Sequence, residues 1–253
     1  MIDYAIVVLS CDKYSSLWPG FFGRLNKHWT DSPADIFLVT NHLEPKLPNV
    51  TNLAIGDDVD WSTNLLNALS RINAEYVYII LEDIFIKKDI DTSRFKTAVD
   101  FIHSVKPDYL NTRSHPKARG PKHGRLVREL VKGTHYRASV TNAFWRKDML
   151  ASLLVPGESP WEFERRGSER SNSSAGFYGM VGAMLEYHHV IIGGRVARDV
   201  LNIKDIVGTK ILEDFYTLDR RAWFLFQASL IRNKFFSRVV PQRLQQRARR
   251  FFD

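Results

Sequence analysis

The chain has 253 residues, of which 44% are hydrophobic and 25% are charged, as in an ordinary globular protein with a substantial core. Its single cysteine, Cys11, excludes an internal disulfide and a multi-cysteine metal site, and it suits a reducing compartment. Residues 1–219 carry 27 basic and 27 acidic side chains, whereas residues 220–253 carry nine basic and one acidic, so the net charge of +8 belongs to the C-terminal segment. A neutral body with a basic tail argues against a nucleic-acid-binding protein with one positive face.

The N-terminus predicts no secretory signal. Residues 1–6 lack a basic stretch followed by a long apolar one. No segment of the chain approaches the ~18 consecutive apolar residues that a membrane span needs. We therefore expect a protein of the cytoplasm.

Short apolar runs alternate with helical patterns over the first 112 residues. Runs such as Tyr4–Leu9 and Tyr76–Leu81 hold bulky or β-branched residues without charge, which predicts strands buried on both faces. Asp60 or Ser62 can cap one helix, and Asp91 can cap another. The expected strands are 4–9, 36–40, 50–55, 76–81 and 108–112, and the expected helices are 15–29, 61–72 and 91–105. This alternation predicts an α/β fold with a mostly parallel sheet flanked by helices.

The second half is less regular. Residues 113–125 are rich in Pro, Gly and basic side chains, which predicts a mobile loop. It would serve as a lid, contact an anionic acceptor, or simply be solvated. We expect a hairpin from residues 126–130 and 134–138, a helix from Phe144 to near Pro156, and a last strand over 186–192. Beyond Arg220, apolar side chains repeat at helical spacing beside arginines. This predicts basic amphipathic helices that lie on an anionic membrane surface or pack on the body.

A helix start is expected at Ser159. Ser159 at the N-cap, Pro160 at the first helical position and Glu162 at the third form a capping-box pattern. Glu162 and Glu164 are two residues apart, so their side chains point in different directions on a helix. At most one of them can face a given site.

Two carboxylates directly follow the strand over residues 76–81. Charged side chains are rarely tolerated in a core, so Glu82 and Asp83 should lie where this strand leaves it. In open α/β sheets that end of a strand borders the ligand crevice. Adjacent carboxylates there can hold a divalent cation, and phosphate oxygens of a ligand complete its coordination shell. The alternative is a solvated acidic turn. No glycine-rich dinucleotide motif follows the first strand.

Three stretches together resemble GT-A-type glycosyltransferases, and more narrowly the bacterial enzymes that build capsular or lipopolysaccharide sugars. They are the turn at residues 10–14, the Leu-Glu-Asp element at 81–83, and the segment from Trp145 through the block at 156–164. The resemblance spans roughly residues 3–200. It implies one catalytic domain over 1–218, with a nucleotide-sugar half (1–112) and an acceptor half (113–218), followed by basic helices at 219–253.

The resemblance also implies roles for individual residues. Glu82 and Asp83 match the family's metal-binding acidic motif, although Ile84 and Phe85 stand where a second aspartate would, so Mn²⁺ or Mg²⁺ dependence is open. Basic side chains replace the metal in some relatives, and Arg195 or Arg198 could do so here. Glu162, with Glu164 second, is the expected base of an inverting transfer. The expected nucleotide-binding residues are Ser10, Asp12, Lys13, Trp61 and Asn64.

These residue types also have ordinary alternatives, with Asp12 as a turn former, Trp61 as core and Asn64 as an exposed helix residue. The expected function is transfer of a sugar from a nucleotide-sugar to a glycan or lipid-linked acceptor, on the inner face of the cell membrane and without a nucleic-acid partner. One alternative is a nucleotidyltransferase, which needs a basic glycine-rich segment after the first strand, where only Lys13 is present. Others are an inactive glycan-binding protein and a nucleic-acid binder that uses the arginine tail.

Overall fold

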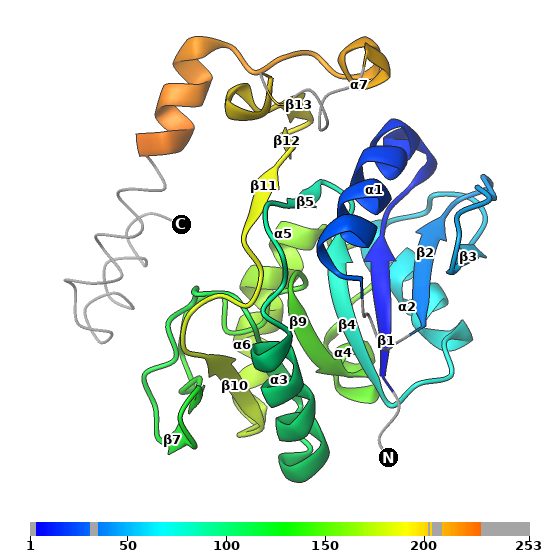
Figure 1. Cartoon of the computed structure of the whole chain (residues 1–253). Coiled ribbons are helices and arrows are strands. Elements are labelled where there is room, and N and C mark those ends of the chain that lie inside the picture. The colour runs from blue at the N-terminus through cyan, green and yellow to red at the C-terminus, as the bar shows by residue number, and fades with distance from the viewer. Residues whose placement is uncertain (1–3, 31–34, 202, 204–208, 229–253) are drawn as a thin grey trace. The chain divides into compact units, whose positions relative to one another are not determined.

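The computed structural model describes residues 4–30, 35–201, 203 and 209–228, in two compact units divided between His188 and His189. The first unit is built on a nine-stranded sheet (Figure 1). In sheet order, its strands are β3 (Val50–Ala54), β2 (Ile36–Thr40), β1 (Tyr4–Leu9), β4 (Tyr76–Leu81), β9 (Ala143–Arg146), β6 (Tyr109–Asn111), β10 (Phe177–Met180), β8 (Val127–Glu129) and β7 (Lys122–His123).

Most strands of this sheet run in one direction. β1 pairs in parallel with β2 and β4, β2 with β3, and β6 with β10. Within the described sheet, β9 and β8 alone run the other way, β9 between β4 and β6 and β8 between β10 and β7. The predicted α/β architecture with a mostly parallel sheet is confirmed.

Helices cover both faces of the sheet. On one face lie α1 (Trp18–His28) and α3 (Thr92–Val105), where Phe95 of α3 packs against Phe144 with ring centroids 5.7 Å apart. On the other face lie α2 (Trp61–Arg71) and α4 (Lys147–Leu153), which contribute Leu65 and Leu150 to a core that includes Trp145. Strands with both faces covered are uniformly apolar, which explains why β1 and β4 could be recognised from sequence.

The predicted helix caps are present. Asp60 accepts a hydrogen bond from the Thr63 N–H at 2.9 Å, and Asp91 accepts one from the Arg94 N–H at 3.1 Å. These bonds satisfy backbone donors that the first turn of each helix leaves without an intrahelical partner. The helix expected over 15–29 begins instead as a 3-10 turn, η1 (Asp12–Leu17), before α1.

The helix predicted to begin at Phe144 is wrong at its start. Residues 143–146 form β9, and the helix begins only at Lys147. Phe144 and Trp145 are both fully buried and lie on opposite faces of the strand, as alternation requires. A short apolar run fits a buried strand or a buried helix equally well, and here pairing with β4 and β6 decides.

The hairpin predicted from 126–130 and 134–138 is also wrong. Both edges of β8 are already occupied, by β7 and β10, so residues 134–138 have no edge to pair with. That segment is held instead by Arg137, which is fully buried and donates to the carbonyls of Leu130 and Ser174 at 2.8 and 2.9 Å. β7 itself comes from the predicted loop at 113–125.

The strand predicted over 186–192 is divided in two. Its first part is β11 (Tyr187–His189), which pairs with β5 (Ile84–Ile86). Its second part, β12 (Ile191–Ile192), pairs with β13 (Arg195–Val196) in the second unit. That unit also contains η4 (Arg198–Val200), α7 (Thr209–Asp214) and a helix over 220–228.

The predicted apolar stripe of the C-terminal extension is described only in part. The rings of Trp223 and Phe226 stack 5.9 Å apart, whereas Leu230 and the repeat beyond Pro241 lie outside the described residues. Over the described part of the chain, no helix combines the length and apolar character needed to cross a bilayer.

The strand order fixes where a ligand crevice should be. After β1 the chain builds β2 and β3 on one side of it, and then places β4 on the other side. The carboxyl ends of β1 and β4 therefore flank a topological switch point, the usual ligand position in open α/β sheets.

Candidate active site

The acidic pair lies at this switch point. β4 ends at Leu81, Glu82 and Asp83 form the turn, and β5 begins at Ile84. Leu9 of β1 pairs with Leu81, so the residue after β1, Ser10, is beside Glu82. The turn thus stands where the fold alone predicts ligand binding.

Both carboxyl groups of the turn are withdrawn from solvent. Glu82 is only 8% exposed, and Asp83 is half-buried. Burial raises the pKa of Asp83 to about 7. Burial, followed by the neighbouring Asp83, raises the pKa of Glu82 well above its usual range. Among the residues that the structure describes, neither carboxylate forms an ion pair that would offset this burial.

The turn has the character of a cation site. The Asp83 Oδ1 atom is buried and has no hydrogen-bond partner among the described residues. The described part of the chain has no cluster of three or more Asp, Glu, His or Cys side chains placed to bind a metal. Mg²⁺ and Mn²⁺ accept one or two carboxylates when substrate phosphates and water complete the shell. Glu82 and Asp83 could supply these one or two carboxylates, but they are too few to form a metal site made of protein ligands alone.

A third carboxylate, Glu164, belongs to a polar cluster on another element. It lies in the π-helical turn η2 (Phe163–Gly167), which follows α5 (Pro160–Glu162). Its Oε1 accepts hydrogen bonds from the Ser139 hydroxyl and from the Val140 N–H at 3.3 Å. The same Ser139 hydroxyl accepts a hydrogen bond from the Arg113 guanidinium, which follows the carboxyl end of β6.

Tyr187 connects this cluster to the acidic turn. Burial raises the pKa of its phenol, the Arg113 guanidinium opposes that rise, and the Asp83 and Glu164 carboxylates add to it. Strand β11, which carries Tyr187, pairs with β5, which begins directly after Asp83, so two segments distant in sequence meet at the acidic turn.

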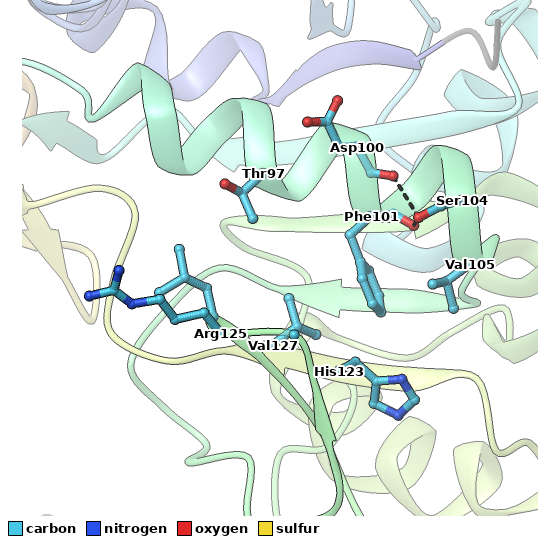
Figure 2. A pocket seen from close by; sticks show the side chains of 10 residues that line it. Thr97, Asp100, Phe101, Ser104, Val105, His123, Arg125 and Val127 are labelled. Carbon is cyan, nitrogen blue, oxygen red and sulfur yellow. Dashed lines mark hydrogen bonds between the residues drawn. The ribbon is translucent and has the colours of Figure 1, made fainter.

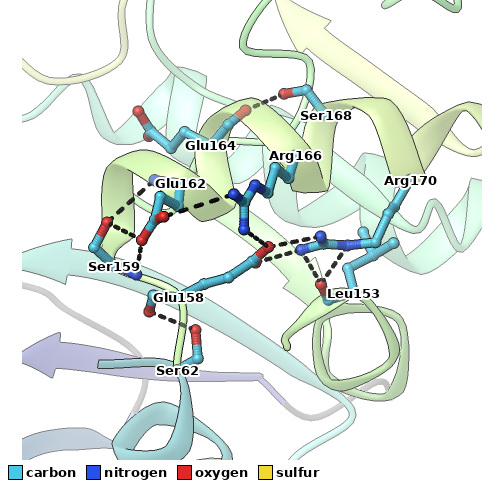
Figure 3. A network of polar contacts seen from close by, with 9 residues as sticks. All are labelled: Ser62, Leu153, Glu158, Ser159, Glu162, Glu164, Arg166, Ser168 and Arg170. Carbon is cyan, nitrogen blue, oxygen red and sulfur yellow. Dashed lines mark hydrogen bonds and ion pairs between the residues drawn. The ribbon is translucent and has the colours of Figure 1, made fainter. Parts of the chain in front are cut away.

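Glu162 has a different environment from Glu164. Figure 3 shows its carboxylate against Ser159, whose N–H and hydroxyl both donate to Oε2, at 3.0 and 2.9 Å. These bonds, the backbone one first, lower the pKa of Glu162. Its side chain is 41% exposed and lies 3.9 Å from Arg166. The capping box expected from sequence is present, and it engages Glu162, the carboxylate that the sequence favours as the base.

A buried ion pair holds the start of this helical segment. Glu158 is 4% exposed and receives two bonds from the Arg170 guanidinium, at 2.9 and 2.6 Å (Figure 3). Its backbone carbonyl accepts the Ser62 hydroxyl of α2 at 2.8 Å. Trp61 packs on Phe163 with centroids 5.6 Å apart. The segment that carries Glu164 is therefore fixed to α2.

The predicted nucleotide-binding residues have mainly structural contacts. The Asp12 carboxylate accepts backbone N–H bonds from residues 41, 42 and 43, so it closes the loop after β2. The Ser10 hydroxyl accepts the Trp18 indole N–H at 2.8 Å, and Asn64 donates to Asp58 at 2.5 Å. Lys13 is exposed. Of the predicted set, Ser10 is beside the acidic turn, and the nucleotide contacts of the others remain predictions.

Arg195 and Arg198 belong to the second unit. Arg195 pairs with Asp219 at 3.6 Å, and Arg198 donates to the Leu218 carbonyl at 3.2 Å. Their predicted replacement of a metal stays a prediction.

Sequence reasoning did not identify Ser139 or Tyr187, and it considered Arg113 only as part of a basic loop. None of them lies in a recognisable motif. Their shared property is that segments distant in sequence converge on the carboxyl edge of the sheet, which only the strand order reveals.

The structure also has a groove of about 570 Å³ between α3 and the β7–β8 hairpin (Figure 2). Phe101 and Val127 lie at its centre, with Arg125 near one end and His123 near the other. None of the candidate site residues lines it.

No protein-family model and no curated protein sequence matches this chain. Solved structures do. The chain is similar in structure to S. aureus TarS. Residues 1–349 of TarS in complex with UDP-GlcNAc align at 15% identity and a TM-score of 0.45, over 74% of this chain and 60% of that one. Another TarS structure aligns at 14% identity and a TM-score of 0.47, over 79% and 40%.

The bifunctional IspDF from Campylobacter jejuni aligns at 14% identity and a TM-score of 0.38, over 61% of this chain and 44% of that one. This chain thus spans less than two thirds of the length of each of these proteins. At such low similarity, function has to be inferred from the site residues.

Proposed function

We propose that this protein is a glycosyltransferase that moves a sugar from a nucleotide-sugar donor to an acceptor hydroxyl. The observation that carries the proposal is the buried acidic turn at the β1–β4 switch point, where Glu82 is 8% exposed and the Asp83 Oδ1 atom has no hydrogen-bond partner among the described residues. The acidic turn and the helix glutamate are also the elements on which the sequence resembles GT-A glycosyltransferases.

The reaction has to neutralise the leaving diphosphate and to remove a proton from the acceptor hydroxyl. The acidic turn suits the first task and Glu164 suits the second. The acceptor oxygen forms a bond to the anomeric carbon while the bond from that carbon to the leaving diphosphate breaks. A divalent cation, when bound, would neutralise the diphosphate. Asp83 and Glu82 would hold that cation in a site where their own charges are otherwise uncompensated. Glu164 would accept the proton of the acceptor hydroxyl as general base.

Glu164 is a better candidate for the base than Glu162. Two donors hold its Oε1 atom, and one of them, the Ser139 hydroxyl, is itself bonded by Arg113 from the carboxyl end of β6. Glu162 is engaged in the capping box and an ion pair with Arg166. A base on the face opposite the leaving group implies inversion at the anomeric carbon. Glu164→Gln should lower kcat by about 10²- to 10⁴-fold, the usual contribution of a general base.

The finer assignments rest on sequence. We propose a glycan or lipid-linked acceptor in bacterial surface polysaccharide synthesis, and attachment to the inner membrane face through the basic tail. Removal of residues 220–253 should release the protein from vesicles that contain anionic lipid, because each basic group near such a surface contributes about 1 kcal/mol. Equal binding by the truncated chain would contradict the tail's role.

The test of the proposed function is ligand-induced stabilisation followed by turnover. UDP, GDP, CDP and dTDP are added with and without Mn²⁺, and the Tm is measured for the wild type and for Asp83→Asn. One diphosphate should raise the Tm of the wild type but not of the variant, and the matching nucleotide-sugars are then assayed for transfer. Stabilisation without any transfer would favour an inactive binding protein. No stabilisation by any diphosphate would contradict the proposal.

A further inference from the structure

Ser139 is fully buried in the segment that leads into β9. Its backbone is anchored, because its carbonyl accepts the Trp145 indole N–H at 3.0 Å. Since the backbone contact of Ser139 does not need a hydroxyl, alanine would serve there equally well unless the hydroxyl makes specific contacts. Two charged side chains contact that hydroxyl, Arg113 and Glu164.

The direction of these hydrogen bonds is determined by the chemistry of the groups. A guanidinium can only donate, so the Ser139 oxygen must accept from Arg113. The hydroxyl has one proton, and it is donated to the Glu164 Oε1 atom. The hydrogen bonds therefore all point the same way, from Arg113 through Ser139 to Glu164. The arginine, by donating to the hydroxyl oxygen, fixes the rotation of the hydroxyl.

The second donor makes the effect on Glu164 asymmetric. The Val140 N–H also donates to Oε1, at 3.3 Å. Among the described residues, both donors to this carboxylate act on Oε1, which leaves Oε2 for another partner. A carboxylate held through one oxygen has its other oxygen at a defined place, which is what proton transfer to an acceptor requires.

We propose that Ser139 is a positioning residue for Glu164: its hydroxyl, oriented by Arg113, holds Oε1 so that Oε2 receives the acceptor proton. The proposal rests on the proposed function, because it assigns the base to Glu164. It identifies the hydroxyl of one buried serine as the group that controls the chemical step without touching the substrate.

The decisive experiment is a double-mutant cycle. Ser139→Ala, Glu164→Gln and the double variant are compared for kcat and for the KM of donor and acceptor. A misplaced base should lower kcat by about 10- to 100-fold with little change in KM, because a small displacement is enough for such a loss. In the double variant Ser139→Ala should cost nothing further, since the group that it positions is already absent. Independent, multiplied losses would overturn the proposal.

Ser171→Ala is the matched control. Ser171 is also fully buried and accepts a bond from a buried arginine, Arg137, at 3.0 Å, but it does not contact the Glu164 carboxylate. Its effect on kcat should be small and should multiply with that of Glu164→Gln. Arg113→Lys keeps the charge and loses the forked geometry, so it should show a smaller kcat loss that also vanishes in the Glu164→Gln background.

A measurement independent of turnover separates the two proposals. In protein labelled with ¹³C-glutamate, the Glu164 carboxyl resonance is identified by its loss in Glu164→Gln. It should move in Ser139→Ala and in Arg113→Lys, and stay in place in Ser171→Ala. If the wild type transfers no sugar but the resonance moves, the proposed function fails and the Ser139 contact stands. If the resonance is the same in all variants, the positioning role fails.

Discussion

Two buried acidic groups of this protein have opposite electrostatic environments. Glu158 is 4% exposed, and the Arg170 guanidinium binds both of its oxygens. Asp83 is half-buried, and its Oδ1 atom has no partner among the described residues. A buried carboxylate that the chain itself neutralises is part of the structure, whereas one that is left uncompensated costs stability and is usually retained for a ligand. The comparison separates structural from functional acids without reference to any relative.

The largest expected effect is a loss of stability when the ion pair of Glu158 is broken. Arg170→Ala removes the two-pronged partner of the buried Glu158 carboxylate and leaves it with Arg166 alone, at 3.8 Å, which should lower the free energy of unfolding by about 1–3 kcal/mol. Urea denaturation measures this. Arg165→Ala is the control, because Arg165 is exposed on the same segment and should change stability by less than about 0.5 kcal/mol. A loss below about 1 kcal/mol for Arg170→Ala would break the comparison.

The opposite result is expected for the uncompensated acid. Asp83→Asn removes a charge that burial disfavours, so the variant should unfold at a Tm about 2–4 °C higher than the wild type in the absence of ligands. The same change should abolish stabilisation by Mn²⁺ together with a nucleoside diphosphate. Asp35→Asn, at an exposed position, is the control. A lower Tm for Asp83→Asn would assign Asp83 to the structural class.

The pH dependence sharpens the same distinction. Asp83 has a pKa of about 7 in the fold, against 3.8 as its ordinary value, so the folded state holds a proton between these pH values that the unfolded state has lost. Ligand-free stability should therefore be greatest at the acid end of this window and fall as the pH rises through 7. Mn²⁺ competes with that proton, so its stabilising effect should grow from pH 6 to pH 8. Thermal unfolding at each pH measures both trends, and Asp83→Asn should weaken them and leave the contribution of Glu82, whose pKa is raised first by burial.

The smallest effect concerns the exposed acid of the capping box. Glu162→Ala removes the acceptor of the Ser159 N–H and hydroxyl, which should lower the Tm only slightly because the side chain is exposed. Turnover should stay within about twofold of the wild type, in contrast to Glu164→Gln. Glu169→Ala, at an exposed position nearby, controls for loss of a surface charge. A large loss of turnover in Glu162→Ala would return the base to Glu162.

Features that depend on local chemistry could be predicted from the sequence. The uncharged runs of β1 and β4, the Asp60 and Asp91 caps and the Ser159 capping box each follow from neighbouring residues, and each is present. The acidic pair could be placed at a strand end for the same reason. What local chemistry could not decide was the state of residues 143–146, because an apolar run takes its structure from its partners.

The candidate site was less predictable than the fold. A capping motif drew attention to Glu162, although the same motif is the reason why its carboxylate is engaged elsewhere. The surroundings of Glu164 come from Ser139 and Arg113, which lie 25 and 51 positions earlier in the chain and have no motif of their own. Only the order of strands at the carboxyl edge brings them together.

The position of β9 has a consequence for how the chain acquires its structure. β6 reaches the sheet only through β9, which is synthesised some thirty residues later and must be inserted between β4 and β6. A fragment that ends near residue 112 would leave the long inner edge of β4 open to other chains, so it should aggregate rather than behave as a separable nucleotide-binding half. The nucleotide-sugar half and the part of the acceptor half up to His188 would then form one cooperative folding unit, with the slow closure typical of non-local strand pairing.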